Sequence, residues 1–223
     1  MRVTTRLILS FVVTLSGHIG TEAAYASDEP PSIARTTAPL FSPTNRPSFK
    51  ATVRREGGSG LTPVTRAYLD VGTSKLGLQI PTGFRAETSS SDRVTLVSRD
   101  FACLITVRLL GPHPEGSRHL THDTYRNKVH NENLTSQILA EFGVVSMGQG
   151  GPAFDLQSSE KGGATRRTQI AFVPSNAGVL EFTLACNPET LERARQALNV
   201  VLSTLRQSDE AGKLHMPEIR SDI

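Results

Sequence analysis

The two cysteines are the residues whose pairing offers the simplest chemistry in this chain. Cys103 shares one face of an expected strand with Ile105 and Val107, and Cys186 shares a face with Leu184. In an exported chain, two cysteines most simply form one disulfide, which would close a loop of 83 positions and stabilise the fold by roughly 2–4 kcal/mol. The alternative is a pair of buried free thiols. A catalytic thiol is disfavoured because neither cysteine has a neighbouring base in the sequence.

A second group with chemical potential is formed by His119, His122 and Asp123. Their i, i+3, i+4 spacing would place all three on one helix face, where they could bind zinc and support a metal-dependent hydrolase. A hydrolytic zinc helix also supplies a glutamate base, and none lies between these residues. The competing interpretation is a set of exposed polar side chains at a helix start. We therefore expect no bound metal, no cofactor and no catalytic residue.

The first residues have the composition of a secretory signal peptide. Arg2 and Arg6 form a basic start, an apolar run of nine residues covers 7–15, and an Ala-Tyr-Ala sequence ends at Ala26 before Ser27. The apolar run is far shorter than the roughly 20 residues that cross a bilayer. We expect cleavage between Ala26 and Ser27 and a periplasmic or secreted protein, with no membrane span in the mature chain.

The charge balance argues against nucleic acid as a partner. Cleavage would remove two arginines and one glutamate, leaving 22 basic and 20 acidic side chains, a net charge of +2. Such a weak field steers few ligands, and the chain has no run of five like charges. The expected partner is an unidentified protein or a component of the cell envelope.

Composition divides the chain into four parts. Residues 1–26 are the expected signal peptide, and residues 27–63 form an expected disordered leader with six of the 13 prolines. Residues 64–206 have the length of a single domain. Residues 207–223 are polar, carry no amphipathic pattern and are expected to form a disordered tail.

The hydrophobic patterns within 64–206 predict an α+β fold. Alternation and Gly-bearing turns favour strands joined as hairpins, and an apolar stripe near the end predicts a helix that starts at Asn187 and Pro188. Runs of strands followed by helices indicate a central antiparallel sheet of about six or seven strands, flanked by two main helices. The expected strands are 67–71, 76–80, 94–98, 102–110, 153–157, 167–173 and 179–186, and the expected helices are 120–142 and 187–206.

Several phrases of the sequence resemble the PsbP-like domain family. The segment LGLQIPTGF at 76–84 is similar to that family's opening strand, proline, glycine and aromatic residue, although Phe84 stands where tryptophan is commoner. The return GPAFDLQ and the closing PETLERARQALNVVLSTLR are also similar. The resemblance covers about 65–206 and implies an α/β/α sandwich. Its members include a photosystem II extrinsic protein, DcrB-type periplasmic lipoproteins and a Ran-binding nuclear protein, so it implies no single function and no catalytic motif.

These observations favour an exported, non-enzymatic accessory or binding module of the cell envelope or extracellular space. Two alternatives stay open. One is a metal-dependent hydrolase that uses His119, His122 and Asp123; the other is a secreted effector in which the leader 27–63 has a function of its own.

Overall fold

The computed structural model describes residues 48–57, 62–90, 92–111, 121–159 and 163–208. The expected signal peptide, its cleavage residues Ala26 and Ser27, His119 and most of the expected tail lie outside these ranges. Within them, none of the helices combines the length and the apolar character that a membrane crossing requires.

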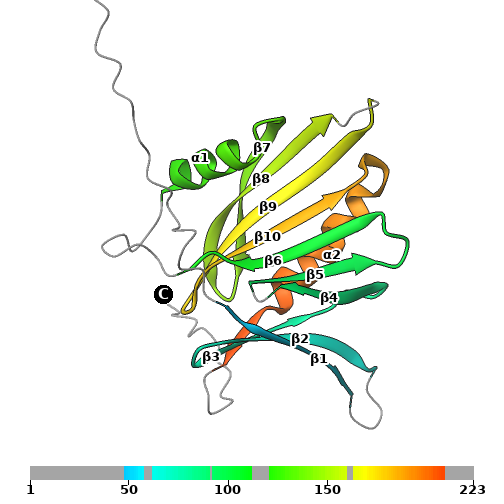
Figure 1. Ribbon diagram of the computed structural model, residues 1–223, viewed down its shortest axis with the longest axis vertical. Helices are drawn as coiled ribbons and strands as arrows, with labels where there is room; N and C mark the ends of the chain where they lie inside the picture. Colours follow the sequence, from blue (N-terminus) through cyan, green and yellow to red (C-terminus); the bar gives the residue numbers. More distant parts are fainter. Residues whose placement is uncertain (1–47, 58–61, 91, 112–120, 160–162, 209–223) are drawn as a thin grey trace, which may run out of the picture. The chain divides into compact units, whose positions relative to one another are not determined.

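The largest element is a seven-stranded antiparallel sheet with the order β4-β5-β6-β10-β9-β8-β7 (Figure 1). Two meanders, β4 to β6 and β7 to β10, join where β6 pairs with β10. This agrees with the expected α+β class and antiparallel sheet. The strands are β4 (Phe84–Ser90), β5 (Arg93–Ser98), β6 (Cys103–Leu109), β7 (Ser136–Ser146), β8 (Gln149–Ser159), β9 (Thr165–Ser175) and β10 (Gly178–Cys186).

A second, four-stranded sheet has the order β1-β2-β3-β11. Its strands are β1 (Lys50–Glu56), β2 (Val64–Val71), β3 (Ser74–Gln79) and β11 (Arg206–Ser208).

Strand β1 corrects the expected boundary of the domain. The prediction of disorder over 27–63 is wrong for residues 50–56, which pair with β2 along their whole length. Most β1 side chains are exposed, so the strand forms through its backbone hydrogen bonds rather than through an apolar pattern of its own. The preceding Phe49 is buried in the core, which therefore begins before residue 64. Likewise, Gln207 and Ser208 belong to β11 and not to a disordered tail.

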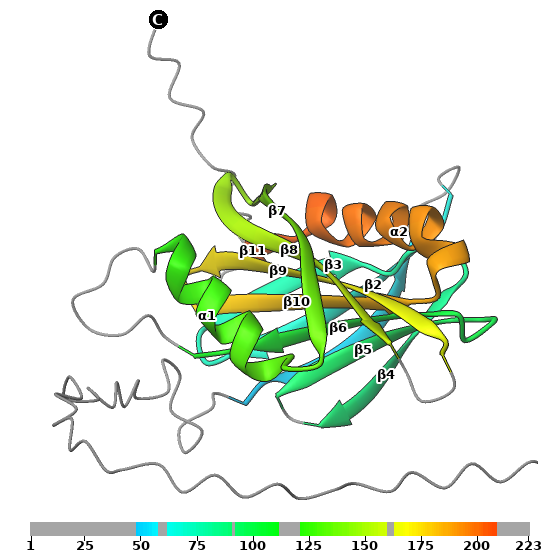
Figure 2. The ribbon, with the colours of Figure 1, turned by 90° about the horizontal axis from the view of Figure 1, so that it is seen from above.

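The two helices pack on opposite faces of the seven-stranded sheet (Figure 2). Helix α2 (Leu191–Thr204) follows the short 3-10 turn η2 (Pro188–Thr190) and shares a core with the four-stranded sheet. Helix α1 (His122–Glu132), capped by the Thr121 hydroxyl, packs on the other face. Alternation along the strands produces this division, because neighbouring strand residues point to opposite faces. Ala153 and Ala171 thus face α2, while Phe154 and Phe172 face α1.

The predicted helix over 120–142 is wrong beyond residue 132. Helix α1 ends at Glu132, and 136–146 form the edge strand β7, paired with β8. The spacing of Leu134, Ile138 and Phe142 imitates a helical stripe, yet Leu134 is 76 % exposed and lies outside the core. Pairing with β8 outweighed the local pattern.

The β7–β8 hairpin needs glycine where β8 approaches β9. A Cβ at Gly151 would lie 1.8 Å from the carbonyl oxygen of Phe172, which no side chain can tolerate. The absence of a side chain at this position lets the backbone of β8 lie close to the Phe172 carbonyl of its neighbour β9.

Candidate functional site

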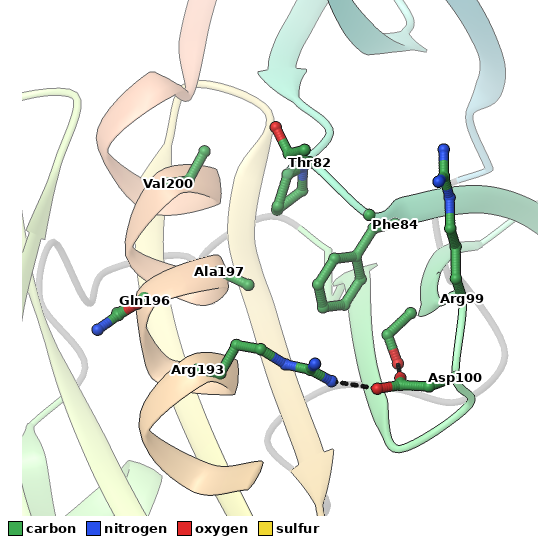
Figure 3. Close-up of a pocket in the computed structure, with 11 residues that line it drawn as sticks. Thr82, Phe84, Arg99, Asp100, Arg193, Gln196, Ala197 and Val200 are labelled. Atoms are coloured by element: carbon green, nitrogen blue, oxygen red, sulfur yellow. Dashed lines mark hydrogen bonds and ion pairs between the residues drawn. The ribbon is translucent and has the colours of Figure 1, made fainter.

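A groove lies between helix α2, the β3–β4 turn and the β5–β6 hairpin (Figure 3). It encloses about 380 Å³. The residues that line it come from separate stretches of the chain: Pro81, Thr82, Gly83, Phe84, Ser98, Arg99, Asp100, Arg193, Gln196, Ala197 and Val200.

One side of the groove is apolar. The Phe84 ring extends towards the α2 face that carries Ala197 and Val200 (Figure 3). A tight turn places Phe84, with Gly83 at a φ of 84° and the Phe84 amide donating to the Pro81 carbonyl at 3.0 Å. This side can accept an apolar side chain.

The other end of the groove is closed by an ion pair between Arg193 and Asp100, which are 93 positions apart in the sequence. The Asp100 carboxylate also accepts hydrogen bonds from the Ser98 hydroxyl at 2.7 Å and from the Ala102 amide at 3.2 Å. These donors, the Arg193 guanidinium first, hold the pKa of Asp100 well below its usual range. The carboxylate therefore stays ionised and keeps the hairpin oriented towards α2.

At the tip of the same hairpin, Phe101 is 69 % exposed and has a φ of 57°. Bulky side chains rarely adopt this left-handed conformation, which costs on the order of 1–3 kcal/mol. The ring is covered on one face by the Arg85 guanidinium, 4.8 Å from its centroid. Arg85 in turn pairs with Glu87 at 2.8 Å.

The turn between β5 and β6 also carries Arg99. Its amide donates to the Gly83 carbonyl at 2.9 Å, which fixes the backbone. In Figure 3 its side chain lies on the side of Phe84 that faces away from α2. The side chain is exposed and has no ion-pair partner among the residues that the structure describes.

The two described members of the candidate metal-binding group, His122 and Asp123, do not line this groove. His122 and Asp123 lie in the first turn of α1, whereas His119 is outside the described ranges. His122 packs its ring 5.3 Å from that of Phe154 and lies 3.6 Å from the Glu141 carboxylate. Over the described residues, no three His, Cys, Asp or Glu side chains are close enough together to hold a metal ion.

The two cysteines lie directly opposite each other on β6 and β10. Both are buried, and the structure contains them as free thiols. The Cys103 thiol donates a hydrogen bond to the Thr190 hydroxyl at 3.6 Å. The Asp100 carboxylate, which accepts a hydrogen bond from Arg193, is the main cause that raises the pKa of Arg193. Burial, and secondly the neighbouring Cys103, raise the pKa of the Cys186 thiol.

A second hollow, of about 330 Å³, lies beside the four-stranded sheet. Its polar groups already bind one another: Glu56 accepts a hydrogen bond from the Tyr68 hydroxyl and pairs with Arg66 at 3.1 Å. The groove beside α2 therefore offers more to a ligand.

No pattern in the sequence pointed directly to this groove. Arg99, Asp100 and Phe101 have the pattern of an ordinary tight hairpin, and Arg193 that of a polar position on a helix. One signal was present: Phe101 stands at a turn position where glycine or asparagine would adopt the backbone conformation with less strain.

The fold and the groove define an antiparallel α+β domain with one helix on each face of its main sheet. No family model matches the chain, and neither does any curated protein. Similar solved structures include PsbP from Synechocystis sp. PCC 6803, at 8 % identity and a TM-score of 0.44, covering 74 % of this chain and 95 % of that one. They also include LpqN of Mycobacterium tuberculosis, described as involved in cell envelope biogenesis, at 12 % identity, a TM-score of 0.42 and coverages of 72 % and 91 %.

A third similar structure is that of a point mutant of the protein Mog1, at 13 % identity, a TM-score of 0.43 and coverages of 69 % and 95 %.

Proposed function

We propose that this protein is an exported, non-enzymatic accessory module that binds an acidic polypeptide segment through its hairpin-tip surface. This surface consists of Phe84, Arg85, Arg99, Phe101 and Arg193. The export part of the proposal rests on the basic start, the apolar run and the Ala26–Ser27 cleavage sequence.

The observation that carries the binding proposal is the state of Phe101. A strained and exposed aromatic residue is doubly unfavourable in a protein that uses it for nothing, because both strain and exposure could be removed by one substitution. Binding a partner would bury the ring, which contributes roughly 1.5–3 kcal/mol. Phenylalanine and arginine are also the kinds of residue that interfaces favour over the rest of the surface.

Charge specifies the chemistry of the partner. Arg85 and Arg193 each have one carboxylate partner, Glu87 and Asp100, whereas Arg99 has none among the described residues. The surface therefore carries an excess positive charge beside an apolar groove. A segment that combines aspartate or glutamate with an aliphatic or aromatic side chain complements both features.

The binding test uses a photoreactive phenylalanine analogue at position 101 of the full chain, expressed in its native cells. The matched control carries the analogue at Val53, which is 51 % exposed on β1. We expect a discrete crosslinked species from position 101 that Arg99→Glu abolishes, and none from position 53. The same pattern of crosslinks from both positions, or none from either, would overturn the binding proposal.

A fluorescent peptide of alternating aspartate and leucine then tests the predicted chemistry, with its lysine–leucine counterpart as control. We expect the acidic peptide alone to bind, and we expect Arg99→Glu to lower the affinity for this peptide by roughly tenfold or more. Preference for the basic peptide would contradict the assigned charge. N-terminal sequencing of the protein recovered outside the cytoplasm tests export separately, with Ser27 expected as the first residue.

A further inference from the structure

The register of β6 and β10 places Cys103 and Cys186 in direct opposition across two antiparallel strands. Residues in such positions have Cα atoms about 4.5–5.5 Å apart, within the range of about 4.4–6.8 Å that disulfides span. Both side chains point to the sheet face that packs against α2, because both belong to the same core cluster. The register and the shared face are therefore compatible with a bond between the two sulfurs.

The surroundings isolate this pair from other chemistry. Cys103 is 1 % exposed and Cys186 is 3 % exposed, below the start of α2. The Thr190 hydroxyl contacts the Cys103 thiol at 3.6 Å. No third metal-binding side chain joins the two cysteines among the described residues.

We infer that Cys103 and Cys186 form a cross-strand disulfide in the exported protein, a covalent modification site in the core beside α2. Two thiols and one disulfide oxidant, either a small molecule or a protein dithiol in its oxidised form, exchange to give the Cys103–Cys186 bond and two thiols on the oxidant. The two cysteine protons and two electrons pass to the oxidant. This inference rests on the export part of the proposed function and not on the binding part.

Burial sets the order of events. An oxidant cannot reach the sulfurs once η2 and α2 cover them, so the bond forms while the strands are paired and the helix is still undocked. After docking, the same cover protects the bond from reductants. Reduction in the native state should therefore be slow and should accelerate when denaturant opens the fold.

The bond also reaches the hairpin that carries Phe101. The Cys103 amide donates to the Ser98 hydroxyl at 2.9 Å, and that hydroxyl donates to Asp100 at 2.7 Å. A covalent anchor at Cys103 thus holds the strand end from which the hairpin projects.

The test uses the expected mature chain, residues 27–223, refolded from denaturant in a buffer of reduced and oxidised glutathione. Alkylation under denaturing conditions followed by mass measurement counts the free thiols. We expect monomer with no label, about 2 Da lighter than the reduced chain. Two labels per chain, glutathione adducts on each cysteine, or disulfide-linked dimers would each overturn the inference.

Thermal unfolding of the refolded chain provides the second measurement. We expect reductant to lower the midpoint by roughly 5–15 °C, as loss of a disulfide across a long loop would. The matched control is the double variant Cys103→Ala, Cys186→Ala, whose thermal unfolding midpoint should not change when reductant is added. If that variant fails to fold, the alkylation result on the unmodified chain still decides. An equal response of both proteins to reductant would contradict a structural bond.

Discussion

Lys128 on α1 and Glu181 on β10 form an ion pair of 3.0 Å in which each side chain is only 8 % exposed. Glu181 also accepts from Arg108 at 2.7 Å, and Glu132 contacts both cations. The Lys128 ammonium lies 5.9 Å from the centroid of the Phe172 ring. The four charges join α1 to β6 and β10 beside the apolar contacts of Tyr125 and Val129.

Breaking this network from the carboxylate side should be costly. Glu181→Gln leaves Lys128 and Arg108 without a buried counter-charge, and we expect a loss of about 3–5 kcal/mol in the free energy of unfolding. Glu132→Gln is the control. The Glu132 side chain is 49 % exposed, so its substitution should lower the free energy of unfolding by less than about 1 kcal/mol. Urea unfolding measures both, and equal losses would mean that the network is not organised around Glu181.

Gly151 offers a test of the close approach between the backbones of β8 and β9. Gly151→Ala would place a methyl group 1.8 Å from the Phe172 carbonyl oxygen, and we expect a loss of about 3 kcal/mol or more. Gly150→Ala, one residue earlier, meets nothing within 4 Å and should change stability little. The difference between their denaturant midpoints is the measurement. Similar midpoints would show that β8 does not approach β9 so closely.

Phe101 should separate stability from binding. Phe101→Asn replaces a strained bulky residue with one that tolerates a positive φ. We therefore expect the free energy of unfolding, measured by urea denaturation, to rise by about 1 kcal/mol. The same change removes the exposed ring, and binding of the acidic peptide should fall. Reduced stability would show that the Arg85–Phe101 contact outweighs the backbone strain.

The Asp100–Arg193 pair predicts a shift in titration. In the intact protein the pKa of Asp100 lies below its usual range, mainly because Arg193 donates to it. Arg193→Gln should raise that pKa towards the ordinary value, while Gln196→Ala on the same helix should not move it. Because the folded-state pKa is depressed, the contribution of the pair is present above the unfolded pKa and is lost as pH falls through the folded value. The chemical shift of the Asp100 carboxyl carbon, followed by NMR as a function of pH, measures this pKa in the intact protein and in both variants.

Tyr125 predicts the behaviour at alkaline pH. Burial against Phe172 raises the pKa of its phenol to about 12, from a usual value of 10.0. The folded protein therefore keeps a proton that the unfolded chain loses, and stability falls as pH rises from about 10 to 12. The loss should reach about 2–3 kcal/mol. Tyr125→Phe should remove this part of the pH dependence; an unchanged slope would assign it to another group.

Local pattern was sufficient for the parts of the fold whose side chains alternate or recur with a clear period. The alternation of Cys103, Ile105 and Val107 predicted β6, and the stripe through Leu198 and Leu202 predicted α2. Strand β7 was mistaken because Leu134, Ile138 and Phe142 fit a helical period, and only pairing with β8 decides otherwise. Strand β1 was missed because it carries little apolar pattern of its own.

The groove was beyond the reach of local pattern for a different reason. Its ion pair joins two residues that are 93 positions apart, and its apolar side needs Phe84 to meet a helix that lies far later in the chain. Neither residue looks unusual beside its own neighbours. Only the strain at Phe101 has a local cause, and that strain becomes visible once the backbone is known.

The position of β11 has a consequence for how the protein is made. Its residues Arg206–Ser208 pair with β3, whose partners Lys75 and Gly77 are synthesised about 130 residues earlier. Neither the four-stranded sheet nor the core beneath α2 can close until nearly all described residues have emerged. Contacts between distant segments also slow folding. Among the described residues, the last strand thus completes the first sheet, so the fold closes late in synthesis.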